Sequence, residues 1–183
     1  MTPPQREVLA LIHAELGVAP PGATGEQVAA LGQRLGLASP CELQGLLLLC
    51  TAPQVGPAGI LGIAPTQPFL DLETILGQHR DDGWADRGWL PIAGDGCGSY
   101  YVVATQAFSP TGHPIYFIDE CDYTSAVHVC ASELWQFLRF LLTAERLAED
   151  EYDTDWPYNK SRVLADDPAL AGITTPPLPW DVV

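Results

Sequence analysis

Residues 94–99, GDGCGS, combine three glycines with an aspartate and could in principle form a phosphate-binding loop. Such a loop leads directly into a helix, whose free N–H groups and dipole hold the anion. Here aromatic and β-branched residues stand on both sides of the loop, and they favour extended strands. The Lys-Ser/Thr ending of a nucleotide P-loop is missing, and Asp95 would repel a phosphate. We therefore interpret the stretch as a hairpin turn that Asp95 caps by accepting backbone N–H groups.

The cysteines and histidines lack the spacing of a metal site. The cysteines form no Cys-x-x-Cys pair and the histidines form no HExxH-like cluster; they are Cys41, Cys50, Cys97, Cys121, Cys130, His13, His79, His113 and His128. Zinc sites use closely spaced ligand pairs, and secreted disulfide frameworks use even numbers of cysteines. We expect buried reduced thiols, no metal and no other cofactor. Residues 149–155, EDEYDTD, lack the glycine and spacing of an EF-hand, and we expect an acidic surface segment there.

A hydrolase would need a nucleophile beside a base. The best candidates are His113 or His128 with Asp119 and Ser125. Ser125 stands in DYTSAVH, which is not a GxSxG nucleophile elbow, and residues so close in the chain need not converge. An enzyme is therefore the weakest alternative, and we expect no catalytic residues.

The net charge of the chain indicates more about its partners than these candidate catalytic residues do. The chain has 23 acidic and 8 basic residues, a net charge of −15. This charge repels nucleic acid and anionic lipid and attracts cationic proteins, although acidity can also serve solubility alone. The longest apolar run, residues 46–50, is too short to span a membrane, and the N-terminus lacks the features of a signal peptide. We expect a cytoplasmic protein, a monomer or weak dimer, that binds neither nucleic acid nor membrane.

Apolar spacing predicts helices in the first half of the chain. Val8, Leu9, Ile12 and Leu16 form one helical face, and Thr24 begins a capping-box helix. A third helix is predicted after Ser39, with Ser39 as N-cap, proline at the first helical position and a buried leucine stripe.

Strands dominate the centre of the chain. Residues 60–64 are a short strand candidate, and residues 69–76 fit a helical turn or a strand. Extended residues flank the hairpin turn, and further strands are expected at 113–119 and 126–130, before a helix over about 132–147. We expect Trp89 in the core, whereas Trp84 fits either the core or a partner contact. The pattern predicts one α+β domain over 1–183, with a mainly antiparallel central sheet flanked by N-terminal helices and a C-terminal helix.

Several of these segments resemble motifs of the SUKH superfamily, which is named for a yeast regulator of cell-wall glucan synthesis and its bacterial relatives. The resemblance rests on SPCEL at 39–43, WLPIA at 89–93, the turn glycines with Asp95, YFID at 116–119 and ELWQFL at 133–138. It spans about 24–147, which leaves a helical extension at 1–23 and an acidic, proline-rich extension at 148–183. The chain departs from the family in having CTAPQVGPAG in place of an Asn-Gly step, and Ser99 in place of an acid.

The resemblance implies a binding fold without a catalytic set. Bacterial members are similar to immunity proteins that neutralise a secreted toxin domain, often a nuclease, and fungal members resemble regulatory hubs. The first interpretation is therefore an immunity protein for a basic toxin domain, and the alternative is a regulatory scaffold with a cellular partner. The candidate partner-binding residues are acids and their aromatic neighbours: Asp119, Glu120, Asp122, Tyr123, Glu149, Asp150, Glu151, Tyr152, Asp153, Asp155 and Trp156. For each acid the alternative is a solvated surface charge.

Overall fold

The computed structural model describes residues 1–36, 40–64, 66–150 and 156–182, without the side chains of 145–150. Its centre is an antiparallel sheet whose spatial order follows the chain: β1 (Trp89–Gly94), β2 (Tyr100–Ala104), β3 (Ile115–Ile118) and β4 (His128–Ala131). Consecutive strands are joined by short connections, which is why all of the pairings are antiparallel. The α+β fold and the antiparallel sheet are as predicted.

The GDGCGS stretch is the hairpin turn between β1 and β2. Asp95 Oδ1 accepts the N–H groups of Cys97 at 2.8 Å and Ser99 at 2.9 Å. Gly96 and Gly98 have φ values of 84° and 115°, which side-chain-bearing residues rarely adopt. The predicted turn and its aspartate cap are confirmed.

Helices surround the sheet: α1 (Pro3–Leu16), α2 (Gly25–Leu35), α3 (Cys41–Leu49), α4 (Leu72–Gln78), α5 (Leu134–Asp150) and α6 (Lys160–Asp166). Thr24 and Gln27 form the predicted capping box of α2. Pro40 precedes α3 as its cap residue instead of opening it, and Ser39 lies outside the described residues. The sequence of residues 69–76 fits a helical turn or a strand, and in the structure the stretch becomes helical from Leu72, where α4 begins. Asp71 caps this helix by accepting the N–H of Thr74 at 3.0 Å.

Both edges of the sheet are covered by irregular segments. Residues 60–64, expected as a strand, make only isolated bridges, and Leu61 donates its N–H to the Ile92 carbonyl of β1 at 2.8 Å. At the other edge, Val129 of β4 donates to the Pro177 carbonyl at 3.0 Å. Covered edges prevent pairing with another chain through the sheet.

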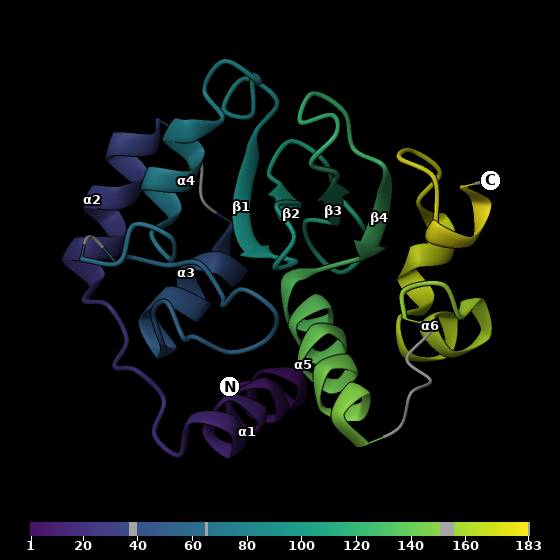
Figure 1. Cartoon of the computed structure of the whole chain (residues 1–183), viewed down its shortest axis with the longest axis horizontal. Helices are drawn as coiled ribbons and strands as arrows, with labels where there is room; N and C mark the ends of the chain where they lie inside the picture. Colours follow the sequence, from purple (N-terminus) through teal and green to yellow (C-terminus); the bar gives the residue numbers. More distant parts are fainter. Residues whose placement is uncertain (37–39, 65, 151–155, 183) are drawn as a thin grey trace.

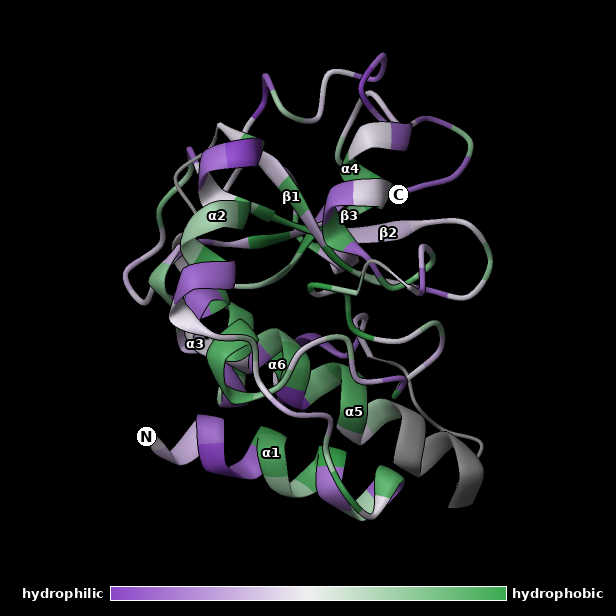
Figure 2. Ribbon diagram, turned by 90° about the vertical axis from the view of Figure 1, so that its left-hand side faces the viewer, coloured by the Kyte–Doolittle hydropathy of each residue, from purple (hydrophilic) through white to green (hydrophobic). Residues whose placement is uncertain are grey.

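The helices fall into groups around the sheet. Figure 1 shows α2, α3 and α4 on the β1 side, the C-terminal segment on the β4 side, and α5 running beneath the strands beside α1. Hydrophobic residues are concentrated in the strands and in α3 and α5, as Figure 2 shows. Trp84 and Phe137 are fully buried, and Trp89 is buried as predicted.

The two ends of the chain both pack on α5. Arg139 of α5 lies 3.9 Å from Glu7 of α1 and 3.4 Å from Asp166 of α6. The buried carboxylate of Asp167 accepts the N–H of Ser132 at 2.7 Å and its hydroxyl at 2.6 Å. Two 3₁₀ turns, Pro168–Gly172 and Pro179–Asp181, complete this C-terminal segment. Within the described parts of the chain, no helix is both long and apolar enough to cross a membrane.

Candidate functional site

The site begins where two loops meet at one end of the sheet. In an antiparallel meander the β1–β2 turn and the β3–β4 loop leave the sheet at the same end. The Glu120 N–H donates to Ser99 Oγ at 3.1 Å, and the Tyr123 hydroxyl donates to the Gly98 carbonyl at 3.0 Å. The two loops therefore form one surface.

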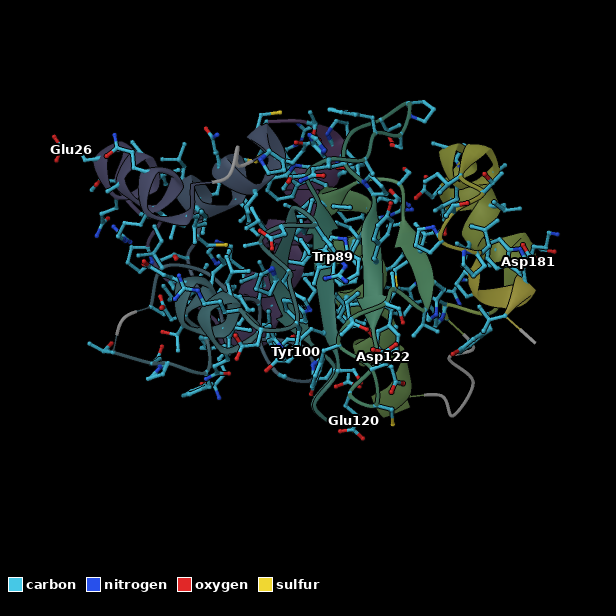
Figure 3. The ribbon with its side chains drawn as sticks, turned by 90° about the horizontal axis from the view of Figure 1, so that it is seen from above. Glu26, Trp89, Tyr100, Glu120, Asp122 and Asp181 are labelled. Carbon is cyan, nitrogen blue, oxygen red and sulfur yellow. The ribbon has the colours of Figure 1, made fainter. Side chains whose placement is uncertain are left out.

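We call the four carboxylates of this surface, Asp95, Asp119, Glu120 and Asp122, the acidic end. Glu120 and Asp122 are exposed, whereas Asp95 and Asp119 are half-buried. Figure 3 shows Glu120 and Asp122 on the same side of the molecule, away from Glu26 and Asp181 at the two ends of its long axis. The structure therefore brings the predicted residues Asp119, Glu120 and Asp122 together and adds Asp95.

Local hydrogen bonds hold the carboxylates of the β3–β4 loop in place. Asp122 accepts the Ser125 hydroxyl at 2.6 Å, the Thr124 hydroxyl at 2.6 Å and the Thr124 N–H at 2.9 Å. These bonds, that of Ser125 foremost, lower the pKa of Asp122 to about 2. Asp119 likewise accepts the Cys121 N–H at 2.8 Å. The negative charge of Asp122 is thus fixed in position and persists at acidic pH.

An aromatic cluster supports the loop from below. It consists of His79, Trp84, Tyr100 and Tyr123, in which the His79 and Trp84 rings stack at 4.0 Å between centroids. The buried Trp84 donates its indole N–H to the Tyr123 carbonyl at 2.8 Å. His79 Nδ1 lies 2.8 Å from Asp82 Oδ2. Tyr123 is therefore bonded through both its hydroxyl and its carbonyl, and its side chain is half-exposed.

The second predicted acidic segment lies elsewhere. The side chains of successive residues in a strand point to opposite faces of the sheet. Tyr100 and Tyr101 are successive residues of β2. Tyr123 packs with Tyr100, whereas Trp156 packs with Tyr101, Phe137 and Phe140. The structure thus does not join Trp156 to the Tyr123 surface.

Most of that segment is not described. Glu149 and Asp150 end α5, and their side chains are outside the description. Glu151, Tyr152, Asp153 and Asp155 lie outside the described residues. Their part in binding stays a prediction.

An open groove of about 880 Å³ lies beside the acidic end. Three segments line it: the loop after α3, the β1–β2 turn, and α4 with the turn before it. Sequence reasoning missed this groove because its walls are far apart in the chain. The only local signal was the density of glycine and proline in residues 51–59.

The residues of the hydrolase hypothesis have other neighbours. Ser125 is bonded to Asp122, and His113 Nδ1 lies 2.9 Å from the Ala107 carbonyl at the far end of β3. His128 is buried and stacks on Phe117 at 5.1 Å, and burial lowers its pKa to about 4. The geometry does not assemble a nucleophile with a base from these groups.

The thiols divide into two classes. Cys50 and Cys130 are buried, but Cys41, Cys97 and Cys121 are exposed, so the expectation of burial was wrong for these three. Cys41 is the first residue of α3, and Cys97 and Cys121 lie in tight turns. At these positions the side chain faces the surface. Among the described residues, no group of His, Cys, Asp and Glu is placed to hold a metal ion.

Comparison with known proteins gives one family. The family model described as SMI1 / KNR4 family (SUKH-1) matches residues 22–139, more than half of the chain. The match begins just before α2 and ends inside α5, so it includes the whole sheet and the acidic end. A search of curated proteins finds no match.

Proposed function

Because the chain belongs to the SMI1 / KNR4 family (SUKH-1), we propose that it is a non-catalytic protein-binding module, and more specifically an immunity protein. The observation that carries the proposal is the acidic end, where four carboxylates and Tyr123 share two loops that are hydrogen-bonded to each other. The proposed partner is a basic toxin domain, met in the cytoplasm and held there in an inactive complex.

Electrostatics supports this choice of partner. A nuclease holds a polyanion, so its substrate cleft is basic. A protein of net charge −15 is steered toward such a cleft, and carboxylates that are already ordered lose little entropy on binding. Asp119 and Asp122 meet this condition, since backbone or hydroxyl groups bond both of them.

The aromatic cluster supplies the apolar part of such an interface. Interface energy is concentrated in a few aromatic or arginine anchors, surrounded by a polar rim. Tyr123 is half-exposed, its carbonyl accepts the indole N–H of the buried Trp84, and Glu120 and Asp122 lie in the same loop. We propose that Tyr123 packs against the partner while the acids pair with lysine or arginine.

The test looks for a secreted protein encoded next to this gene and co-expresses its C-terminal domain with this chain. Growth rescue and a purified complex are expected. The variant Asp119→Asn/Glu120→Gln removes two charges while keeping hydrogen-bonding capacity, and we expect association to slow by about tenfold at low salt. The matched control Glu26→Gln/Asp181→Asn removes two charges at distant sites and is expected to bind normally.

Two results would count against the proposal. A complex that forms equally well at about 50 mM and about 1 M salt would overturn its electrostatic part, because exposed charges are screened at high salt. The other is no binding to the toxin domain, with a different cellular protein retained, which would favour the regulatory scaffold.

A further inference from the structure

The geometry points to a second element of the interface: we propose that the open groove beside the acidic end receives a short segment of a partner protein with an apolar side chain flanked by lysine or arginine. We call it the glycine groove and define it by Gly56, Ala58, Phe69, Gly94, Gly96 and Gly98. The inference rests on the proposed function only in taking the ligand to be a protein.

The groove exists because glycine lets two backbones approach each other. A Cβ on Gly94 would lie 3.0 Å from the Ala58 Cβ, and one on Gly96 would lie 3.2 Å from the Pro57 carbonyl oxygen. The loop after α3 therefore packs directly on the β1–β2 turn. No side chain rises from these glycines to fill the hollow above them, and its volume of about 880 Å³ leaves room for a short stretch of chain.

The lining of the groove is uncharged and partly apolar. Among the described residues that line it there is no acid and no base. Phe69, which is 57% exposed, forms part of one wall, and the half-buried Tyr100 contributes further apolar surface. An exposed phenylalanine beside a hollow is best covered by an apolar side chain, since burial of both removes apolar surface from water.

The rim of the groove carries negative charge. Asp95 stands between Gly94 and Gly96 in the chain, and both of these glycines line the groove. At Gly98, Glu120 lies so close that an added Cβ would meet its Oε2 at 2.6 Å. An apolar residue seated in the groove therefore has carboxylates beside it, and flanking lysine or arginine residues would pair with them. A second copy of this chain, at −15, is disfavoured by the same charge.

The experiment selects phage-displayed 12-residue peptides on the full-length chain and measures the affinity of a synthetic peptide of the selected sequence. We expect peptides with an apolar residue flanked by lysine or arginine. Phe69→Ala is expected to weaken binding at least about tenfold, the scale of losing one apolar anchor. Gln78→Trp, which adds bulk to the exposed groove wall, should also weaken it. The control Phe108→Ala removes a 78% exposed phenylalanine outside the groove and should have no effect.

Three results would overturn the inference: failure to select any peptide, selected peptides without basic residues, or equal affinity for Phe69→Ala and the unmodified chain. The outcome is separable from that of the proposed function. A toxin domain that binds Phe69→Ala normally leaves the immunity proposal standing and removes the groove from it. Peptides that need Phe69, with no binding of the toxin domain, leave the groove standing and remove the toxin.

Discussion

The hydroxyl of Tyr123 donates a hydrogen bond to the Gly98 carbonyl at 3.0 Å and thereby ties the β3–β4 loop to the β1–β2 turn. The bond spans two loops that carry the four carboxylates of the acidic end. The same residue accepts the Trp84 indole N–H through its carbonyl at 2.8 Å. Tyr123 is thus both a half-exposed aromatic surface and the connection between the loops.

Tyr123→Phe should separate these two roles. The variant keeps the aromatic ring and loses the bond to Gly98, so we expect a loss of about 1 kcal/mol in the free energy of unfolding. Denaturant unfolding measures it, with Tyr158→Phe as the control because Tyr158 is exposed and carries no hydroxyl bond among those described. Hydrogen exchange at residues 119–125 should rise in Tyr123→Phe. Unchanged exchange would show that the loop is ordered without this bond.

Much of the fold can be predicted from local sequence patterns, because the hydrogen bonds that stabilise these elements form between residues close in the chain. The Thr24 capping box and the Asp95 turn each complete their bonds within a few residues. Strand alternation and short turns similarly predict the antiparallel order of the sheet. The acids of the β3–β4 loop stand out in the sequence as a dense run of charge, and their part in binding stays a prediction.

Features that depend on distant segments could not be predicted in this way. The glycine groove needs the approach of residues 57–58 to residues 94–96, which no local pattern encodes. Trp84 follows a polar loop and gives no periodic signal, yet it is buried between His79 and Tyr123. The proline-rich C-terminal segment packs on the domain through scattered contacts, such as the buried Val163 and Leu170 and the bond from Val129 to Pro177, and these residues form no periodic pattern.

His128 should make stability depend on pH. Burial lowers its pKa from 6.5 to about 4, so the unfolded chain binds a proton at a higher pH than the folded chain. The stabilisation is complete above pH 6.5 and is lost as the pH falls from 6.5 to about 4, by at most about 3 kcal/mol. Urea unfolding at several pH values measures this, and His128→Gln should flatten the slope.

Comparing the unmodified chain with His128→Gln separates the pH effect of His128 on stability from that of two buried carboxyl groups. Burial raises the pKa of Glu133 and of Asp167, so the folded chain takes up their protons first and gains stability as the pH falls. This gain opposes the loss at His128. It is present in both proteins, and the difference between the unmodified chain and His128→Gln cancels it. Parallel pH profiles for the two proteins would contradict the assignment.

The thiols should react in two groups. Cys41, Cys97 and Cys121 are exposed and should react with a disulfide reagent in the native protein, whereas Cys50 and Cys130 should react only after unfolding. Burial also raises the pKa of Cys50, to about 11, and that of Cys130. Mass spectrometry of labelled peptides measures each site. Native labelling of Cys130 at the rate of Cys97 would contradict the packing of β4.

Reactivity at Cys121 further tests the acidic end. Asp119 raises the pKa of this thiol by hydrogen bonding and by its charge. The thiolate is the reactive form, so Asp119→Asn should speed labelling of Cys121 at neutral pH. Cys41, whose pKa is raised by Glu42 instead, is the internal control and should be unaffected. An unchanged Cys121 rate would show that Asp119 does not act on this thiol.

The C-terminal segment should depend on Asp167 for its attachment. Asp167 is 3% exposed and accepts both the N–H and the hydroxyl of Ser132, which lies between β4 and α5. Asp167→Ala leaves the Ser132 N–H without its partner, and we expect a loss of about 2–3 kcal/mol in the free energy of unfolding. Asp166→Ala, a neighbouring exposed position, should cost less because its ion pair with Arg139 is partly solvated.

Hydrogen exchange in Asp167→Ala shows whether Asp167 fastens the C-terminal segment or stabilises the whole domain. If Asp167 fastens the segment, Asp167→Ala should raise hydrogen exchange at Val129, whose N–H is bonded to Pro177, before it raises exchange in β2. The segment would then open by itself and uncover the β4 edge. Exchange that rises uniformly over the sheet would show instead that the C-terminal segment unfolds only with the whole domain.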